Sequence, residues 1–250
     1  MSRTEGESLI SRVTRVLEAF DRDNESMPLS TLAHRAGLPI PTTYRLVTEM
    51  VKYGLLDRAA DKDIKIGLHL WELASHGNRG VGLRDAALPF MVDLQSAVHE
   101  VVTLAVLDGQ SALFLERLAP AQTTLEAGRI AERHLLHASS SGLVLLAFAS
   151  QEYQNEVLSR PLERLTDKTV TNPDQLRRLL ADVRQRHFVY ADGYGRPGWT
   201  GVAVPVFGRK HEVVASLSIV YRSRDESPQS QLAAMRTAAA GISRTLTAPY

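Results

Sequence analysis

Apolar residues recur at intervals of three and four positions over the first fifty residues, which is the period of an amphipathic helix. The pattern predicts a first helix that begins near Leu9 and ends near Phe20. A short second helix is expected over residues 31–36, with Ser30 as its N-cap and Gly37 ending it in the left-handed conformation. The chain therefore opens with two helices joined by a polar loop.

A third helix and a small hairpin follow in the pattern. Pro41 suits the first turn of a helix, where a missing N–H costs nothing, and the apolar period continues to about Tyr53 before Gly54. Two short apolar segments, residues 55–58 and 64–66, flank a polar turn and predict a β-hairpin. Three helices and a hairpin in this order are typical of a winged helix-turn-helix.

The rest of the chain differs in character. One more apolar-periodic stretch, residues 68–78, leads into a glycine-rich turn that we interpret as a linker. Beyond it, helices are expected near residues 84–99, 142–149, 152–159, 173–186 and 229–245, and strands near 101–107, 111–118, 189, 202–207 and 213–221. Helices and strands mix without strict alternation, so the expected class is α+β around an antiparallel sheet. The predicted organisation is a winged helix over residues 1–67, a linker helix over 68–82 and a second domain over 83–250.

Composition narrows the classes of function. The chain has 250 residues, of which 44% are hydrophobic, and it contains no cysteine. Disulfides, thiolate metal sites and cysteine nucleophiles are therefore excluded. No apolar run reaches the roughly 18 residues of a membrane span, and the first ten residues lack the order of a signal peptide. We expect a cytoplasmic protein with no membrane partner.

Net charge gives no support for nucleic-acid binding. The whole chain carries +1, and residues 1–67 hold ten Lys or Arg against ten Asp or Glu. A case for DNA must depend on where the charges lie. In a helix-turn-helix the start of the second helix of the pair meets base edges, where Arg can pair with guanine and a Thr methyl can contact thymine.

The predicted DNA-contacting residues come from three places. The third helix offers Thr42, Thr43, Tyr44 and Arg45, the second helix offers Ser30 and Thr31, and the hairpin offers Arg58, Lys62 and Lys65. Their chemistry suits phosphate contacts and base contacts. The same elements also occur in winged domains that bind proteins or act as sensors without contacting DNA, and this alternative stays open at the level of the residues.

Several segments, in order along the chain, resemble the isocitrate lyase regulator (IclR) family of transcription regulators. In the winged helix they are Leu29-Ser30-Thr31-Leu32-Ala33, Gly37-Leu38-Pro39, Thr42-Thr43-Tyr44-Arg45-Leu46 and Gly54-Leu55-Leu56. In the second domain they are Pro89, Leu104-Ala105-Val106-Leu107-Asp108-Gly109, Leu136-His137-Ala138, Ser141-Gly142, Thr166, Lys168-Thr169-Val170-Thr171-Asn172-Pro173, Val183-Arg184-Gln185-Arg186 and Pro205-Val206-Phe207. Their order and spacing together are specific.

The resemblance implies a winged helix plus a GAF-like effector domain, assembled as a homodimer or homotetramer. Such a dimer would bind double-stranded DNA at a pseudo-palindromic operator, because two recognition helices lie about one helical turn apart. The family's effectors are small organic acids. No cofactor and no metal are expected.

The resemblance also implies a set of effector-binding residues on one face of the sheet. Carried over by position, they are Leu125, His137, Ser139, Ser140, Asp192, Gly201, Ser216 and Ser218. The chain departs from the family pattern at Leu143, where lysine is usual, and at Ala131 and Leu135. Residues 193–199 replace an acidic stretch and bring in Tyr194 and Trp199. The effector is therefore expected to be a small acid, with an aromatic part as plausible as a two-carbon one.

Enzymatic alternatives have weak support in the sequence. Gly193, Gly195 and Gly198 match the dinucleotide fingerprint, but the segment contains Pro197 and leads toward a predicted strand rather than a helix. His134 and His137 could suggest a metal, yet no cysteine supports them. We expect no catalytic residues.

Overall fold

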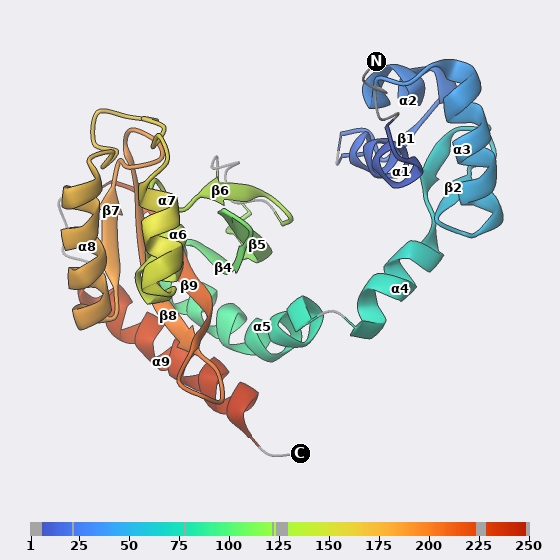
Figure 1. Ribbon diagram of the computed structural model, residues 1–250. Helices are drawn as coiled ribbons and strands as arrows, with labels where there is room; N and C mark the ends of the chain where they lie inside the picture. Colours follow the sequence, from blue (N-terminus) through green and yellow to red (C-terminus); the bar gives the residue numbers. More distant parts are fainter. Residues whose placement is uncertain are drawn as a thin grey trace. The chain divides into compact units, whose positions relative to one another are not determined.

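The computed structural model describes residues 7–21, 23–77, 79–121, 123, 130–223 and 229–248. The chain divides into two compact units, Met1–Arg79 and Gly80–Tyr250 (Figure 1). Each unit has its own core, so each is described by itself. No helix in the described part of the chain is long and apolar enough to span a membrane.

The N-terminal unit is a winged helix. Helices α1 (Leu9–Glu18), α2 (Leu29–Ala36) and α3 (Ile40–Lys52) pack around one cluster of buried aliphatic side chains, and α4 (Leu68–Gly77) follows. The wing is the hairpin β2 (Leu56–Arg58) and β3 (Ile64–Ile66). A third strand, β1 (Ser26–Met27), pairs with β3 and was not predicted, because two residues are too short to show an alternating pattern.

One helix boundary in this unit was wrong. We expected Ser30 to cap the second helix, but α2 begins at Leu29, and Pro28 stands at its N-cap without a side-chain bond. Ser30 therefore lies in the first turn of the helix. Gly37 does end the helix in the left-handed conformation, with φ of 61°, as predicted. Its N–H donates to His34 O and closes the last turn.

The C-terminal unit is built on one six-stranded antiparallel sheet in the order β6-β5-β4-β9-β8-β7. Its strands are β4 (Val101–Asp108), β5 (Ser111–Leu118), β6 (Arg133–Leu135), β7 (Val189–Asp192), β8 (Trp199–Phe207) and β9 (Val213–Arg222). The strands β4, β5 and β9 were predicted closely, whereas β6 was missed. The fold is therefore α+β with an antiparallel sheet, as expected.

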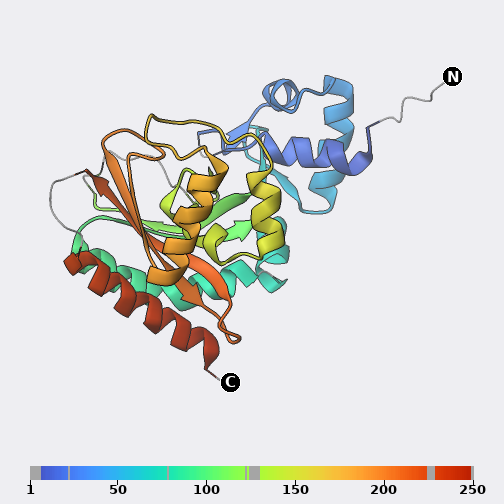
Figure 2. The ribbon, with the colours of Figure 1, turned by 60° about the vertical axis from the view of Figure 1, so that its left-hand side comes forward.

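Helices cover both faces of this sheet. Helices α5 (Arg79–Val98) and α9 (Gln229–Thr247) pack on one face, while α6 (Ser140–Phe148), α7 (Gln151–Leu158) and α8 (Pro173–Arg186) lie on the other (Figure 2). Each face has a separate apolar cluster. Helix α6 is buried along nearly its whole length, since it is enclosed by α8 and the sheet. Its first turn is therefore fixed in place against the strands.

Helix α5 begins earlier than the pattern predicted. We placed its start near Arg84, after a glycine-rich turn, but the helix already begins at Arg79 and includes Gly80 and Gly82. Glycine lowers helix propensity by about 1 kcal/mol, which is why the sequence suggested a break. Burial of Leu83 and Ala87 against the sheet outweighs that local cost.

Candidate nucleic-acid interface and effector cavity

The exposed side of α3 carries the residues expected to contact DNA. Tyr44 is 53% exposed, Arg45 is exposed and Thr42 is partly exposed. The Arg45 guanidinium has no ion-pair or hydrogen-bond partner among the described residues, so its five donors are available. Ser30 and Thr31 are also exposed, at the start of α2.

Thr43 does not belong to this surface. Its side chain is fully buried, and its hydroxyl donates to Pro39 O at 3.2 Å. The expectation that Thr43 lies on the surface of the helix is therefore corrected. Position 43 falls three and four residues before Leu46 and Val47, both buried, which places all three on one face.

The wing adds three cations. Arg58 ends β2, Lys62 lies in the turn with φ of 71°, and Lys65 is in β3 opposite Asp57. All three side chains are exposed, and none has an ion-pair partner in the described parts of the chain. They can therefore contact phosphates without first breaking a bond within the protein.

A cavity of about 340 Å³ lies in the C-terminal unit between the sheet and the N-terminus of α6. It crosses the sheet from β6 to β7. Its walls are made by Thr103, Phe114, Glu132, Arg133, His134, Leu135, Ala138, Ser139, Ser140, Ser141, Leu165, Ala191, Gly195, Arg196, Trp199, Thr200, Gly201, Ser218 and Val220. The volume is in the range of small-ligand pockets, which starts at about 300 Å³.

Hydroxyl groups gather where α6 meets the middle of the sheet. Ser141 Oγ donates to Ser218 Oγ at 3.0 Å, and Ser218 Oγ lies 2.6 Å from Thr103 Oγ1. These three hydroxyls carry three hydrogens and use two of them on one another. One O–H donor is therefore left over, next to the first turn of α6, where backbone N–H groups have no partner within the helix.

The start of α6 is fixed by its cap. Ser139 stands at the N-cap, its Oγ accepts the Gly142 N–H at 3.1 Å, and it donates to Leu135 O at 2.9 Å. Strand β8 approaches closely here, because Gly201 has no side chain. A Cβ at Gly201 would lie 2.5 Å from Ser140 Oγ. The positive end of the helix dipole thus faces the cavity and favours an anion.

The two sides of the cavity are aromatic. On the β6 side, Phe114 packs edge-on against His134, with ring centroids 4.7 Å apart. On the β8 side, two guanidinium groups lie over the Trp199 ring, that of Arg222 at 5.1 Å and that of Arg196 at 6.0 Å from the ring centroid. A ligand in the cavity therefore meets hydroxyls and N–H groups in the middle and aromatic rings at either side, where Glu132, Arg133 and Arg196 also line the walls.

The structure brings together half of the residues expected to bind the effector. Ser139, Ser140, Gly201 and Ser218 line the cavity. His137, Ser216 and Asp192 do not line it, and Leu125 falls outside the described residues. Buried His137 places its Nε2 2.7 Å from Glu163 O, and the buried Ser216 Oγ, two residues along β9, has no hydrogen-bond partner among the described residues.

Asp192 lies beside the cavity without lining it. Its neighbour Ala191 and its cross-strand partner Thr200 are both wall residues. There the carboxylate accepts bonds from Lys168 Nζ, Ser223 Oγ at 2.6 Å and Thr200 Oγ1 at 2.9 Å. These bonds, with Lys168 foremost, lower the pKa of Asp192 to about 2. The carboxylate thus anchors the loop that carries Lys168 to the rim of the sheet.

Several cavity residues were not predicted. Thr103 and Phe114 could have been found, because alternation along strands that were correctly predicted places them on the same face as Ser218. The three residues of β6 could not, since the strand itself was missed. Trp199 and Tyr194 were singled out for aromatic contacts, and only Trp199 lines the cavity.

The two other candidate sites in the sequence, for a dinucleotide and for a metal, can be compared with the structure. The glycines 193, 195 and 198 lead directly into β8, with no helix N-terminus to hold a pyrophosphate. Among described residues, no group of three or more His, Asp or Glu side chains is placed to hold a metal ion.

The winged helix with its exposed cations, joined to a domain with a ligand-sized cavity, defines a DNA-binding regulator that responds to a small molecule. Comparison with known protein families identifies the family of regulators. Residues 9–60 match the IclR helix-turn-helix domain, and residues 78–244 match the family described as bacterial transcriptional regulator IclR C-terminal. The chain therefore belongs to the IclR family of DNA-binding transcriptional regulators, and its C-terminal domain is the effector-binding domain.

Individual relatives agree with this assignment. The chain is 28% identical over 241 residues to the transcriptional regulator KdgR of Dickeya chrysanthemi, covering 94% of this chain and 79% of that protein. It is 28% identical to the repressor IclR of Escherichia coli, covering 84% and 78%. An IclR homologue from Microbacterium hydrocarbonoxydans, solved with 4-hydroxybenzoate, is 42% identical with a TM-score of 0.90 over 97% of this chain and 100% of that one. The first two relatives are named as transcription regulators, and the alternative of a winged helix that no longer binds DNA has no support among the three.

Proposed function

We propose that this regulator responds to a small aromatic acid, of the hydroxybenzoate class, bound in the cavity at the N-terminus of α6. The main support is the arrangement of groups across the cavity, with hydrogen-bond donors in the middle and aromatic side chains at the two sides. A carboxylate would accept from the first N–H groups of α6 and from the spare hydroxyl of the Thr103, Ser141 and Ser218 chain. The ring would pack against Phe114 or Trp199.

The absence of a lysine at position 143 supports an aromatic acid over a two-carbon acid. Leu143 of α6 is fully buried in an apolar cluster, so no ammonium group reaches the cavity from there. The arginines on the cavity walls are Arg133, which pairs with Asp108, and Arg196, which lies over the Trp199 ring. A very small acid must obtain nearly all its affinity from charge, whereas an aromatic acid also gains about 25 cal/mol for each Å² of apolar surface buried. The solved relative with 4-hydroxybenzoate adds to this argument.

On the DNA side, we propose that α3 enters the major groove. Arg45, Tyr44 and Thr42 would contact base edges, while Arg58, Lys62 and Lys65 of the wing and Ser30 and Thr31 of α2 would hold phosphates. A homodimer or homotetramer would place two such helices on a pseudo-palindromic operator. The protein would act in the cytoplasm, where bacterial DNA lies.

Fluorescence anisotropy on a labelled duplex from upstream of the protein's own gene tests the proposal. We expect specific binding at moderate salt whose affinity changes when 4-hydroxybenzoate is added, with a smaller response to benzoate and to glyoxylate. Ligand affinity is measured separately by isothermal titration calorimetry. Absence of any specific DNA binding, or a stronger response to glyoxylate than to 4-hydroxybenzoate, contradicts it.

Two serines on one strand provide a matched pair of variants. Ser218→Ala removes a member of the hydroxyl chain, and we expect ligand affinity to fall about fivefold, because a neutral hydrogen bond contributes about 1 kcal/mol. Ser216→Ala removes a hydroxyl on the same face of β9 that is buried, lies outside the cavity walls and has no partner among the described residues. This control should bind ligand as the native protein does. Equal losses in both variants would remove Ser218 from the site.

A further inference from the structure

A second hollow, of about 470 Å³, lies at the far end of the C-terminal unit from the first turn of α6. It is bounded by the end of α8, the last residues of β8 and the middle of α9. Its walls are Arg186, His187, Val204, Pro205, Phe207, His211, Arg236, Ala239, Ala240, Ser243 and Arg244. It shares no residue with the effector cavity.

The hollow exists because β8 is longer than its neighbour. Strand β7 begins at Val189, which pairs with Ala203, so β8 continues past β7 from Val204 to Phe207. An exposed strand edge normally invites another strand. Here Pro205 has no N–H, and the Phe207 N–H donates to Ser243 Oγ of α9 at 2.9 Å. The edge is therefore capped, and an extended peptide strand is a poor occupant.

The floor of the hollow is apolar and partly aromatic. Val204, Pro205 and Ala239 are buried along it. The Phe207 ring packs with His187 and Phe148, with centroid distances of 5.8 Å to each. Ser243 Oγ donates to Ala239 O as well as accepting from Phe207, so it has no hydrogen left for a ligand. An occupant needs an apolar body that fits this floor.

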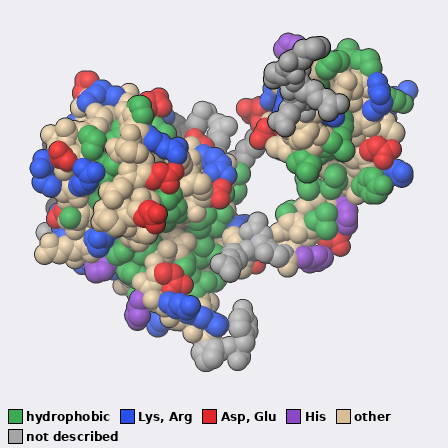
Figure 3. Space-filling view, viewed as in Figure 1, with side chains coloured by type: hydrophobic (Ala, Val, Ile, Leu, Met, Phe, Trp, Pro, Cys, Tyr) green, Lys and Arg blue, Asp and Glu red, His purple; other side chains and the backbone are tan. Residues whose placement is uncertain are grey.

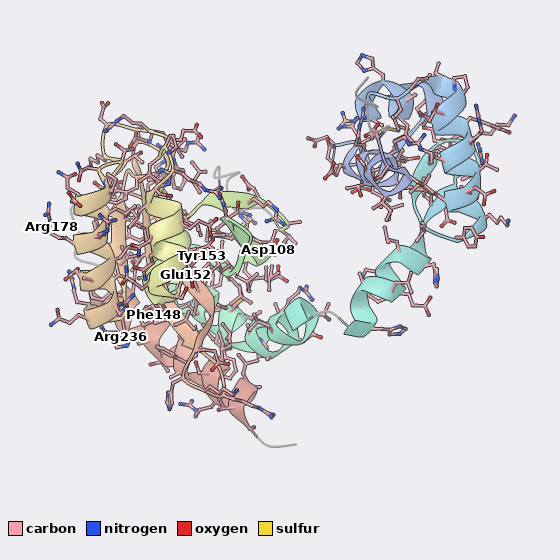
Figure 4. All side chains as sticks on the ribbon, viewed as in Figure 1. Asp108, Phe148, Glu152, Tyr153, Arg178 and Arg236 are labelled. Atoms are coloured by element: carbon pink, nitrogen blue, oxygen red, sulfur yellow. The ribbon has the colours of Figure 1, made fainter. Side chains whose placement is uncertain are left out.

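The rim, in contrast, is cationic. All five titratable residues that line the hollow are basic: three arginines and two histidines. Arg186 pairs with Asp182 at 3.0 Å, but neither Arg236 nor Arg244 has an ion-pair partner among the described residues. Figure 3 shows Arg and His side chains at the lower left of this unit, and Figure 4 labels Arg236 there beside Phe148.

Two of the arginines are held in position. The guanidinium groups of Arg186 and Arg236 lie over the Phe188 ring, at 4.3 Å and 5.6 Å from its centroid. Arg236 also donates to Arg186 O at 3.1 Å, which satisfies a carbonyl at the end of α8. Because Arg236 is already ordered, an anion that binds it loses little affinity to the entropy of that side chain.

We propose that this hollow is a second ligand site, which takes a small organic anion with a flat apolar body. The anionic group contacts Arg236 and Arg244 at the rim, and the body lies on Pro205, Phe207 and Ala239. The regulator would then hold two acids per chain at separate places on the effector domain. This site is independent of the proposed effector cavity and does not rest on it.

A chain without cysteine allows each hollow to be observed separately. Ala240→Cys, on the exposed part of the second hollow, and Leu165→Cys, at the effector cavity, each create a single thiol that can be alkylated with bromotrifluoroacetone. Benzoate is the probe, and the ¹⁹F resonance of each labelled full-length protein is followed as benzoate is added. We expect a saturable shift of the label at position 240.

The Arg236→Ala, Arg244→Ala double variant tests the rim. We expect it to weaken the benzoate response of the label at position 240 at least tenfold. The response of a label at position 165 in the same variant should be unchanged, which also shows that the fold persists. Arg178→Ala, an exposed arginine of α8 labelled in Figure 4 that does not line the hollow, is the matched control and should leave both responses intact.

The outcomes separate the two sites. A shift of the label at position 240 without one at position 165 supports the second site and counts against the effector cavity, while the reverse overturns the second site. An equal shift with inorganic phosphate shows that the apolar body is irrelevant and also overturns it. A response to a glutamate-rich peptide in place of benzoate overturns it as well, and assigns the hollow to an acidic protein partner instead.

Discussion

We expect the regulator's discrimination between DNA sequences to depend on Arg45. It is exposed near the start of α3 and has no partner within the described chain. Arg45→Ala should cost about 1–3 kcal/mol on the operator and leave weak, salt-sensitive binding to other sequences. Anisotropy on operator and scrambled duplexes measures both. An equal loss on the two duplexes would assign Arg45 to the phosphates.

Thr43 is expected to matter for stability and not for DNA. Thr43→Val keeps the shape of the buried side chain but removes the hydrogen bond to Pro39 O. We expect the N-terminal unit to lose about 1 kcal/mol in urea denaturation, while operator affinity per folded molecule is unchanged. Thr42→Val is the matched comparison variant. It should weaken DNA binding and leave the free energy of unfolding unchanged.

Asp192 makes the folding stability of the C-terminal unit depend on pH in the acid range. Its pKa falls from 3.8 to about 2 in the folded state, so the carboxylate stabilises the fold above pH 3.8 and loses that effect as the pH falls toward 2. We expect the urea midpoint to drop more between pH 5 and pH 3 in the native protein than in Asp192→Asn. Identical pH profiles would show that the bonds from Lys168 and Ser223 are not formed in solution.

Individual residues show what the sequence could and could not predict. The resemblance correctly brought Ser139, Ser140 and Ser218 to one place, because they lie at a helix start and on a strand whose position was predicted. Asp192, which the resemblance also named, lies beside the cavity without lining it. Thr43 was placed on the wrong side of its helix, because a threonine in the pattern does not reveal which side of the helix is buried.

At the scale of elements, the caps of two helices provide a contrast. Ser139 caps α6 by a side-chain bond, whereas Ser30, which the sequence suggested as a cap, makes none and lies inside α2. Ser139→Ala should therefore destabilise its unit by about 1 kcal/mol, and Ser30→Ala should change stability by less than about 0.5 kcal/mol. Thermal denaturation compares them. A larger cost at Ser30 would contradict the helix boundary found here.

Long elements were predicted well because their patterns repeat. Helix α8 begins at Pro173 after the Asn172 cap, and β5 covers Ser111–Leu118, both as expected. The strands β1 and β6 were missed because so few residues give a weak pattern, and no short turn joins either one to its partner strand, as one joins β2 to β3. Their pairing is decided by neighbours distant in the sequence, and for β6 this meant that three cavity residues could not be predicted.

At the scale of the whole molecule, the two units have separate cores and should unfold separately. We expect calorimetry to show two transitions, with 4-hydroxybenzoate raising mainly that of the C-terminal unit and operator DNA mainly that of the N-terminal unit. A smaller effect of each ligand on the other transition is expected, because the ligand changes operator affinity only if the two units are coupled. A ligand at 100 times its Kd adds about 2.7 kcal/mol. One shared transition would contradict the expectation that the two cores unfold separately.

The contact between Gly201 and Ser140 has an evolutionary consequence. The cavity keeps its depth only because β8 presents bare backbone to α6, and a methyl group there would displace the Ser140 side chain. Replacing glycine by alanine needs a single base change. A single mutation could thus produce a regulator that no longer responds to its ligand, with the DNA-binding surface untouched. The regulator could regain the response by reverting the same codon.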